Sequence, residues 1–285
     1  MIAAAVRPRG PYSLRATLRH GSDATRSVID GVLVAALACG GGGGGRAWQQ
    51  PDGVVQLRAP SDAGIDELRF VLALDDDHSE FVKRFARDPL IGEAIRRERG
   101  LRPLRTATVA QSLLRAVCGQ LIQASRARQI ERTVIRSLTP GLPGTKLHVP
   151  PACDDFARIA PVELRRLGLG TRRGAAIVRI CRALELERLR SLPGDSPAER
   201  LLRERGLGPW SVGVVFLEGL GRYDRGLVAD LGLVKLLSAM RGRWVEGWET
   251  AELLEPYGEW AGLASIYLLQ AYAKGLVRLP KNAAA

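Results

Sequence analysis

Apolar residues change their spacing along this chain, from a strand-like pattern to a helical one. In the first part, Ser27–Cys39 and Val54–Leu57 have strand character, and Phe70–Leu74 is a further short apolar run. A run of six glycines, Gly40–Gly45, is interpreted as a flexible connection between strands rather than a binding loop. Residues 1–80 are therefore predicted to form a small α+β domain.

From Asp76 onward the apolar positions recur at the three- and four-residue spacing of amphipathic helices. The recurring positions of the first predicted helices are Val109, Leu113, Val117, Leu121, Ile122, Ile130, Val134 and Leu138. Further helices are predicted over Ile177–Leu184, around Leu201 and over Ala261–Gly275. The pattern predicts an α+β fold in which residues 81–285 form an all-helical domain after the N-terminal one.

One segment has the signals of two helices joined by a very tight turn. Ser196 is expected to cap the first helix, with Pro197 in its first turn and Glu199 completing a capping box. That helix is expected to end at Gly206, because glycine readily adopts the left-handed cap, and Pro209 can open the next helix.

The tripeptide Gly-Leu-Gly occurs twice, at 168–170 and 206–208, each time between helical segments. Taken alone, the first is a simple interhelical turn. In the second, the glycines leave the backbone open to a ligand, and the next helix directs its free amides to the same place. This arrangement suits a phosphate group, with Leu207 anchoring the turn. Three neighbouring cations favour the same ligand: Arg203, Arg205 and Arg222.

The charge of the chain is strongly positive and unevenly distributed. The formal net charge is +12, yet residues 1–80 hold 8 Arg, no Lys and 10 acidic residues, whereas the rest holds 34 basic and 20 acidic residues. Such a balance indicates a polyanionic partner, either nucleic acid or an acidic membrane surface. No predicted helix sets a clean basic face against a large apolar one, so nucleic acid is the better interpretation.

Cysteine and apolar content favour a reduced protein that is neither exported nor embedded in a membrane. The four cysteines are too far apart for a metal or iron–sulfur site. No stretch approaches the roughly 18 apolar residues that span a bilayer. Val32–Cys39 resembles an export signal, but it begins too late and follows Asp23 and Asp30. We therefore expect a cytoplasmic location.

Five segments, in this order, resemble the helix-hairpin-helix superfamily of DNA glycosylases. They are Arg115–Ile122, Leu164–Gly170, Gly206–Ser211, Val228–Lys235 and Pro256–Tyr257 with the helix after it. Within the superfamily the chain is most similar to the 3-methyladenine DNA glycosylase II family, in which an α+β domain also precedes the helical part. The resemblance implies base-excision repair by hydrolysis of the N-glycosidic bond of damaged, alkylated bases.

Asp230 lies 20 residues after Trp210 and precedes the apolar-periodic segment Leu231–Met240. By itself it is an ordinary helix N-cap. The resemblance makes it the catalytic carboxylate, and the two roles are compatible, because a carboxylate at the positive end of a helix is stabilised as an anion. Glycosidic cleavage passes through an oxocarbenium-like sugar that such a carboxylate stabilises.

Trp210 decides the predicted subtype. Superfamily members that also cut the strand carry a lysine at this hairpin position, so the resemblance implies a monofunctional enzyme without strand cleavage. Trp210 is then expected to line the base pocket, or else to be a core aromatic. The other positions of the implied pocket are Val214, Leu231, Ile266 and Tyr267. Val214, Leu231 and Ile266 stand where the family often has aromatic residues, a departure that leaves another damaged base as the alternative substrate.

The remaining implied contacts are with DNA. The family places an apolar wedge at Leu121, which fills the gap left by a flipped base; its periodicity equally suits a core residue. Gln120 either hydrogen-bonds near the orphaned base or caps a turn. The hairpin residues implied to contact DNA are Gly206, Leu207, Gly208 and Ser211.

The expected partner is double-stranded DNA containing damaged bases, bound by a monomer at the nucleoid. No metal or other cofactor is expected, apart from a monovalent cation that the hairpin backbone carbonyls would hold. Two alternatives stay open. One is a glycosylase for another lesion, such as oxidised or mismatched bases, and the other is a helix-hairpin-helix protein that binds DNA without catalysis.

Overall fold

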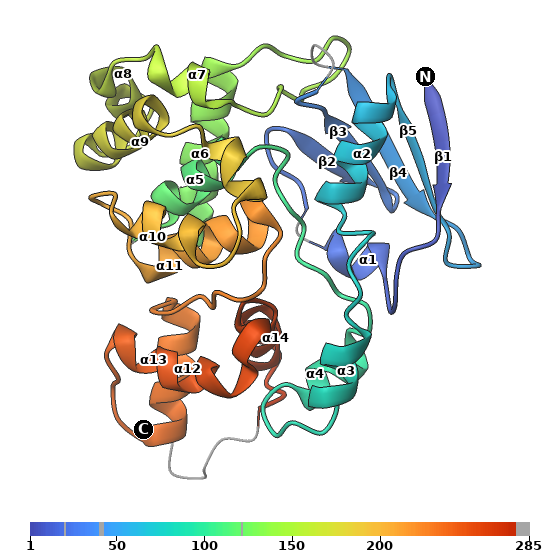
Figure 1. Ribbon diagram of the computed structural model, residues 1–285, viewed down its shortest axis with the longest axis vertical. Coiled ribbons are helices and arrows are strands. Elements are labelled where there is room, and N and C mark those ends of the chain that lie inside the picture. Colours follow the sequence, from blue (N-terminus) through green and yellow to red (C-terminus); the bar gives the residue numbers. More distant parts are fainter. Residues whose placement is uncertain (20, 40–42, 121, 278–285) are drawn as a thin grey trace.

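The computed structural model describes residues 1–19, 21–39, 43–120 and 122–277, and within them a five-stranded antiparallel sheet precedes a large helical region (Figure 1). The strand order is β1-β5-β4-β3-β2. The strands are β1 (Ile2–Val6), β2 (Arg26–Ile29), β3 (Val32–Ala36), β4 (Gly44–Gln49) and β5 (Val55–Ala59). Helix α1 (Leu14–Thr17) follows β1, and α2 (Asp62–Val71) follows β5 and packs on the sheet.

Both segments with strand character contain strands, whereas the third apolar run does not. Ser27–Cys39 contains two strands, β2 and β3, because Asp30 and Gly31 both have positive φ (50° and 77°) and make a tight hairpin turn. Val54–Leu57 overlaps β5. Phe70–Leu74 is the end of helix α2 and the turn after it, where the apolar side chains cover the sheet.

The glycine run is not a connection throughout. Gly44 and Gly45 begin strand β4 and pair with β3, while Gly40–Gly42 lie outside the described residues. A Cβ built on Gly45 would approach the side chains of Leu37 and Leu68 to 3.1 Å, so glycine lets α2 pack closely on this strand. The predicted flexible connection is therefore wrong for the last two glycines of the run.

Twelve further helices follow in the described residues. They are α3 (Ser79–Phe85), α4 (Gly92–Arg97), α5 (Val109–Gly119), α6 (Ala124–Leu138), α7 (Cys153–Ala157), α8 (Pro161–Arg166), α9 (Thr171–Ala183), α10 (Ser196–Leu202), α11 (Pro209–Val214), α12 (Leu231–Arg241), α13 (Thr250–Leu254) and α14 (Ala261–Ala273). A π-helical segment, η2 (Val215–Leu220), continues α11. The α+β class is confirmed. Within the described residues, no helix is long and apolar enough to cross a membrane.

A cluster of buried charges joins the sheet region to the helices. Arg115 of α5 contacts Asp23 at 2.8 Å, Glu131 of α6 at 2.9 Å and Glu218 of η2 at 2.5 Å. Arg26 of β2 adds a second cation, 3.2 Å from Asp23. Burial raises the pKa of the Glu131 carboxyl, and the Arg115 charge opposes that rise. Because the partners come from four segments, the cluster sets the position of α5.

His78 is buried in an aromatic cluster that packs α14 against the segment before α3. Its ring lies 4.9 Å from that of Tyr223 and 5.9 Å from that of Trp260, edge-on to both. Burial, followed by the positive charges of Arg102 and Arg105, lowers the pKa of His78 to about 3. The folded protein therefore holds this imidazole neutral.

The neutral imidazole predicts a specific acid sensitivity. In the unfolded chain His78 has an ordinary pKa near 6.5, whereas the folded protein takes up that proton only near pH 3. Unfolding thus binds a proton between these values, and the His78 contribution to stability falls as the pH falls. Between pH 7.5 and 5 the free energy of unfolding should lose about 2 kcal/mol more in the wild type than in His78→Leu. Urea melts at both pH values measure the difference, and parallel losses would contradict it.

Candidate active site

The hairpin between α10 and α11 has the geometry that its glycines predict. Gly206 has φ +99°, Leu207 is buried, and Gly208 is the N-cap of α11, which opens with Pro209. The predicted start and end of the preceding helix need correction. Asp195, not Ser196, precedes the first helical residue, and no side chain caps it. The helix stops at Leu202 instead of Gly206, so the turn is longer than expected.

The earlier Gly-Leu-Gly turn, between α8 and α9, has the same form. Gly168 has φ +97°, Leu169 is buried, and Gly170 is the N-cap of α9. The second turn packs against α9, the helix that follows the first turn, because a Cβ built on Gly206 would lie 3.4 Å from the Ala176 methyl. The helical region therefore contains two consecutive helix–turn–helix units of like geometry.

The charges beside the second hairpin are only partly available to a ligand. Arg222 pairs with Asp224 at 2.9 Å, and Arg203 lies 3.9 Å from Glu199 with both side chains exposed. Arg205 is exposed and makes no side-chain ion pair among the described residues. The expectation of three free cations is thus met most clearly by Arg205.

Trp210 lies against the end of α5, where the Gly-Gln-Leu segment begins. A Cβ on Gly119 would come within 2.6 Å of the indole ring, so this ring needs glycine there. Gln120 donates from Nε2 to the Gly206 carbonyl at 2.8 Å and to Ser211 Oγ at 3.0 Å. The Gly-Gln-Leu segment and the hairpin are therefore one bonded unit.

Asp230 faces Trp210 across this unit. It is the N-cap of α12, and its Oδ1 accepts from the Gly232 amide at 2.8 Å. Its Oδ2 accepts from Trp210 Nε1 at 2.9 Å. The predicted N-cap is confirmed, and the two donors together with the helix end stabilise negative charge on the carboxylate. The arrangement can oppose a positive charge that develops beside it.

The other predicted pocket residues occupy different environments. Leu231 is 59% exposed at the start of α12, and Ile266 of α14 is half-buried. Val214 is buried in the helical core, and Tyr267 is buried with its hydroxyl donating to the Leu101 carbonyl at 3.2 Å. The structure thus places Leu231 beside the carboxylate and directs Tyr267 away into the core; base contacts by all four stay a prediction.

Leu121, the predicted wedge, lies outside the described residues. Two features of the site were not expected from the sequence. Arg173 of α9 donates to the Gln120 carbonyl, which holds the Gly-Gln-Leu segment from its other side. Ala229, just before the carboxylate, has a positive φ of 69°. Neither has a sequence signal, because each depends on contacts between distant segments.

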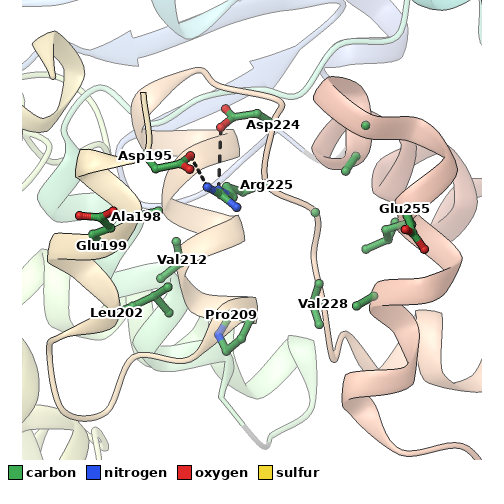
Figure 2. A pocket seen from close by; sticks show the side chains of 15 residues that line it. Asp195, Ala198, Glu199, Leu202, Pro209, Val212, Asp224, Arg225, Val228 and Glu255 are labelled. Atoms are coloured by element: carbon green, nitrogen blue, oxygen red, sulfur yellow. Dashed lines mark hydrogen bonds and ion pairs between the residues drawn. The ribbon is translucent and has the colours of Figure 1, made fainter. Parts of the chain in front are cut away.

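A groove of about 450 Å³ lies beside this site, between α10 and α11 on one side and the segments around Val228 and Glu255 on the other (Figure 2). Trp210 and Asp230 do not line it. Figure 2 shows Arg225 held between Asp195 and Asp224 on its wall. With four carboxylates and one guanidinium the lining repels phosphate, so the groove is not a candidate for DNA.

The fold and the hairpin define a class of protein. No family model matches the chain. A DNA-3-methyladenine glycosylase of Bacillus subtilis is 26% identical over 204 residues, which cover 68% of this chain and 67% of that protein. The 3-methyladenine DNA-glycosylase of Archaeoglobus fulgidus has the same fold, with a TM-score of 0.83, 18% identity, and coverage of 96% of this chain and 99% of that one.

An 8-oxoguanine glycosylase/lyase of Clostridium acetobutylicum, solved with double-stranded DNA, is nearly as similar. Its TM-score is 0.78 at 16% identity, and the match covers 97% of this chain and 99% of that one. Together these similarities confirm the resemblance to the helix-hairpin-helix superfamily of DNA glycosylases that the motifs indicated. Among them, the similarity in sequence is to a 3-methyladenine DNA glycosylase.

Replacing Gly119 by Ala should disturb the site while leaving the fold intact. The added methyl meets the Trp210 ring at 2.6 Å and must push it from Asp230; overpacking of this kind costs about 1–3 kcal/mol. We expect a lower melting temperature and a large loss of base release. Gly170→Ala is the matched control, since nothing lies within 4 Å of its Cβ and its φ is −52°. Equal effects of the two substitutions would contradict the packing argument.

Proposed function

We propose that this protein is a monofunctional DNA glycosylase of base-excision repair, which hydrolyses the N-glycosidic bond of damaged, alkylated bases. The observation that carries the proposal is the hydrogen bond between Trp210 and Asp230, directly beside a helix-hairpin-helix turn. Asp230 also caps α12, but its second carboxylate oxygen is bonded to the indole of the hairpin helix. This contact goes beyond the N-cap role and favours a catalytic protein over one that only binds DNA.

Asp230 stabilises the sugar as its bond to the base breaks. The electron pair of that bond leaves with the base, and positive charge develops on the sugar ring and its anomeric carbon. The carboxylate, fixed by the Gly232 amide and the Trp210 indole, opposes this charge without first having to reorient. Water then adds to the anomeric carbon and loses a proton, which leaves an abasic site in an intact strand.

The hairpin is the part of the protein that binds double-stranded DNA in this proposal. The amides of Gly208, Trp210 and Ser211 have no hydrogen-bond acceptor among the described residues and lie at the start of α11, where a phosphate is favoured. Gln120 binds the hairpin instead of solvent, so its proposed contact with DNA is through the backbone it supports. Leu121 follows it in the chain, and its wedge role is part of the same proposal.

The tryptophan at position 210 supports the monofunctional assignment. Trp210 occupies the position where strand-cutting relatives carry lysine. Among the described lysines, Lys274 bonds to Glu98, and Lys235 is exposed on α12, whose Leu233 and Leu236 face the core. Lys235 is therefore well placed for a phosphate and poorly placed for the sugar.

The class of lesion rests on separate support. The fold matches 3-methyladenine and 8-oxoguanine enzymes almost equally, so fold does not choose between them. The relative in sequence is a 3-methyladenine enzyme, and the Trp210 ring offers an electron-rich face suited to a cationic alkylated base. An oxidised or mismatched base is the second candidate, because Val214, Leu231 and Ile266 replace the expected aromatic rings.

Other parts of the proposal concern organisation. Residues 1–80 and 81–285 are proposed as two domains, supported by separate apolar clusters under the sheet and among the helices. We propose a monomer that acts at the nucleoid in the cytoplasm. A monovalent cation on the hairpin would have to share its carbonyls, since those of Glu204 and Gly206 already accept hydrogen bonds from Leu207 and Gln120.

Asp230→Asn tests the catalytic assignment. The amide keeps the shape and the N-cap oxygen but removes the charge that opposes the sugar cation. Release of methylated bases from alkylated DNA should fall by about a hundredfold or more, as for loss of a well-placed electrostatic group. Binding to an abasic-site duplex should change little. Wild-type release by this variant would exclude the mechanism.

Borohydride trapping tests the monofunctional assignment. Trapping requires an imine between a protein amine and the sugar, and Trp210 stands where strand-cutting relatives carry the lysine that forms it. We expect the wild-type protein to leave an intact strand that breaks only after alkali, with no covalent protein–DNA adduct on reduction. A strand-cutting glycosylase serves as the positive control. Efficient cross-linking by the wild type would point to a nucleophile other than those considered.

A further inference from the structure

We propose that Thr250 is a positioning residue for Asp230, which it holds through the strained residue Ala229. The inference rests on the proposed catalytic role of Asp230. Thr250 opens α13, is fully buried, and forms hydrogen bonds to Ala229 and Gly247 rather than to Asp230 or Trp210. Its Oγ1 accepts the Ala229 amide at 2.7 Å, immediately before the carboxylate residue.

Ala229 needs such support because of its backbone. Its φ of 69° lies in the left-handed region, which an alanine adopts only when its surroundings hold it there. This turn bends the chain between Val228 and Asp230, so the direction of the carboxylate depends on it. The Asp230 amide in turn donates to the Leu227 carbonyl at 3.0 Å, which closes the turn.

The Thr250 hydroxyl makes two hydrogen bonds, one as a donor and one as an acceptor. It donates its one proton to the Gly247 carbonyl at 2.7 Å, so its oxygen is left to accept from Ala229. Ser265 of α14 does the same for Leu227, accepting its amide at 3.0 Å and donating to the Ala261 carbonyl at 2.7 Å. Two buried hydroxyls thus hold alternate amides of the segment that leads to Asp230.

The loop before α13, which packs against Ala229, is itself fixed by the bonds of Glu249. Glu249 bonds to Arg241 at 2.6 Å and to Arg243 at 2.5 Å, and its Oε1 accepts the Glu246 amide at 2.7 Å. Gly247 is thereby pressed against Ala229: a Cβ at 247 would lie 2.8 Å from the Ala229 methyl. The close fit leaves room for only one methyl group between the two positions.

The first test replaces the hydroxyl. Thr250→Val keeps the shape and removes the acceptor, whereas Thr250→Ser keeps the acceptor. On a damaged duplex from which the wild type releases the base, single-turnover release should fall about tenfold or more in Thr250→Val, as expected for a displaced catalytic group. Affinity for an abasic duplex should hold, and Thr250→Ser should restore most of the rate. Thr139→Val, which also removes a buried hydroxyl bonded to a carbonyl, should release bases at the wild-type rate.

A second readout does not depend on activity. The Trp210 indole N–H is bonded to Asp230, so its NMR resonance, assigned with Trp210→Phe, reports where the carboxylate lies. Thr250→Val should shift this resonance in the direction that Asp230→Asn does. If Asp230→Asn is inactive but Thr250→Val has the wild-type rate and resonance, the positioning role is refuted alone. If Asp230→Asn stays active, the proposed function fails, while the resonance still tests the positioning role.

A third test applies even if Thr250→Val does not fold: a methyl group is added at position 247 and one is removed at position 229. Gly247→Ala should displace Ala229, shift the resonance and slow release, because two methyl groups then compete for one space. Adding Ala229→Gly removes the competing methyl and lets residue 229 take positive φ without strain. The double variant should therefore recover the rate and the resonance of the wild type. Failure of Ala229→Gly to improve on Gly247→Ala would overturn the proposal.

Discussion

The contact between the Arg115 guanidinium and three carboxylates is the interaction on which the rest of the structure depends. It joins α5 to the segment before β2, to α6 and to the π-helical end of the hairpin helix. A buried arginine needs such partners, because removing it from water is costly unless its donors are satisfied. The contacts that neutralise the Arg115 charge therefore also determine where α5 lies relative to the hairpin.

The candidate site follows from that placement. Helix α5 and the helix from 209 to 220 run in opposite directions and approach closely at both ends. At one end Gly219 leaves room for Ser112, and at the other Gly119 leaves room for Trp210. Because neither glycine has a Cβ, the indole reaches the end of α5 and its N–H points to Asp230. Packing of the two helices thus places Trp210 beside Asp230 before any ligand is bound.

Sequence patterns predict the local parts of this structure and miss the parts made by distant contacts. The hairpin glycines, the N-cap at Asp230 and most helices follow from turn chemistry and periodicity, which act within a few residues. Strand β1 has a run of alanines and β4 begins with glycines. Both are strands because of pairing, which no short-range pattern encodes.

The same limit applies within the site. Helix α14 is apolar on nearly all sides, so its periodicity cannot say whether Ile266 or Tyr267 faces a base; the structure alone shows Tyr267 bonded to the 98–101 segment. The hold of Thr250 on Ala229 spans 21 residues. This contact could not be predicted from the sequence, because alanine is not a residue type that indicates a positive φ.

The π-helical segment after Trp210 has a consequence for how this helix can change. A π-helix accommodates an extra residue within a helix, so every side chain beyond it is rotated relative to a continuous α-helix. Here that rotation lets Trp210 and Glu218, on the two sides of the π-segment boundary, both face α5. A regular α-helix of the same length would turn Glu218 about 80° away from Trp210, because eight residues at 3.6 per turn overshoot two full turns. Such a helix could satisfy the indole or the ion cluster but not both. The spacing of these two residues therefore requires the π-helical turn, and a chain one residue shorter there would meet the same two contacts with an ordinary α-helix.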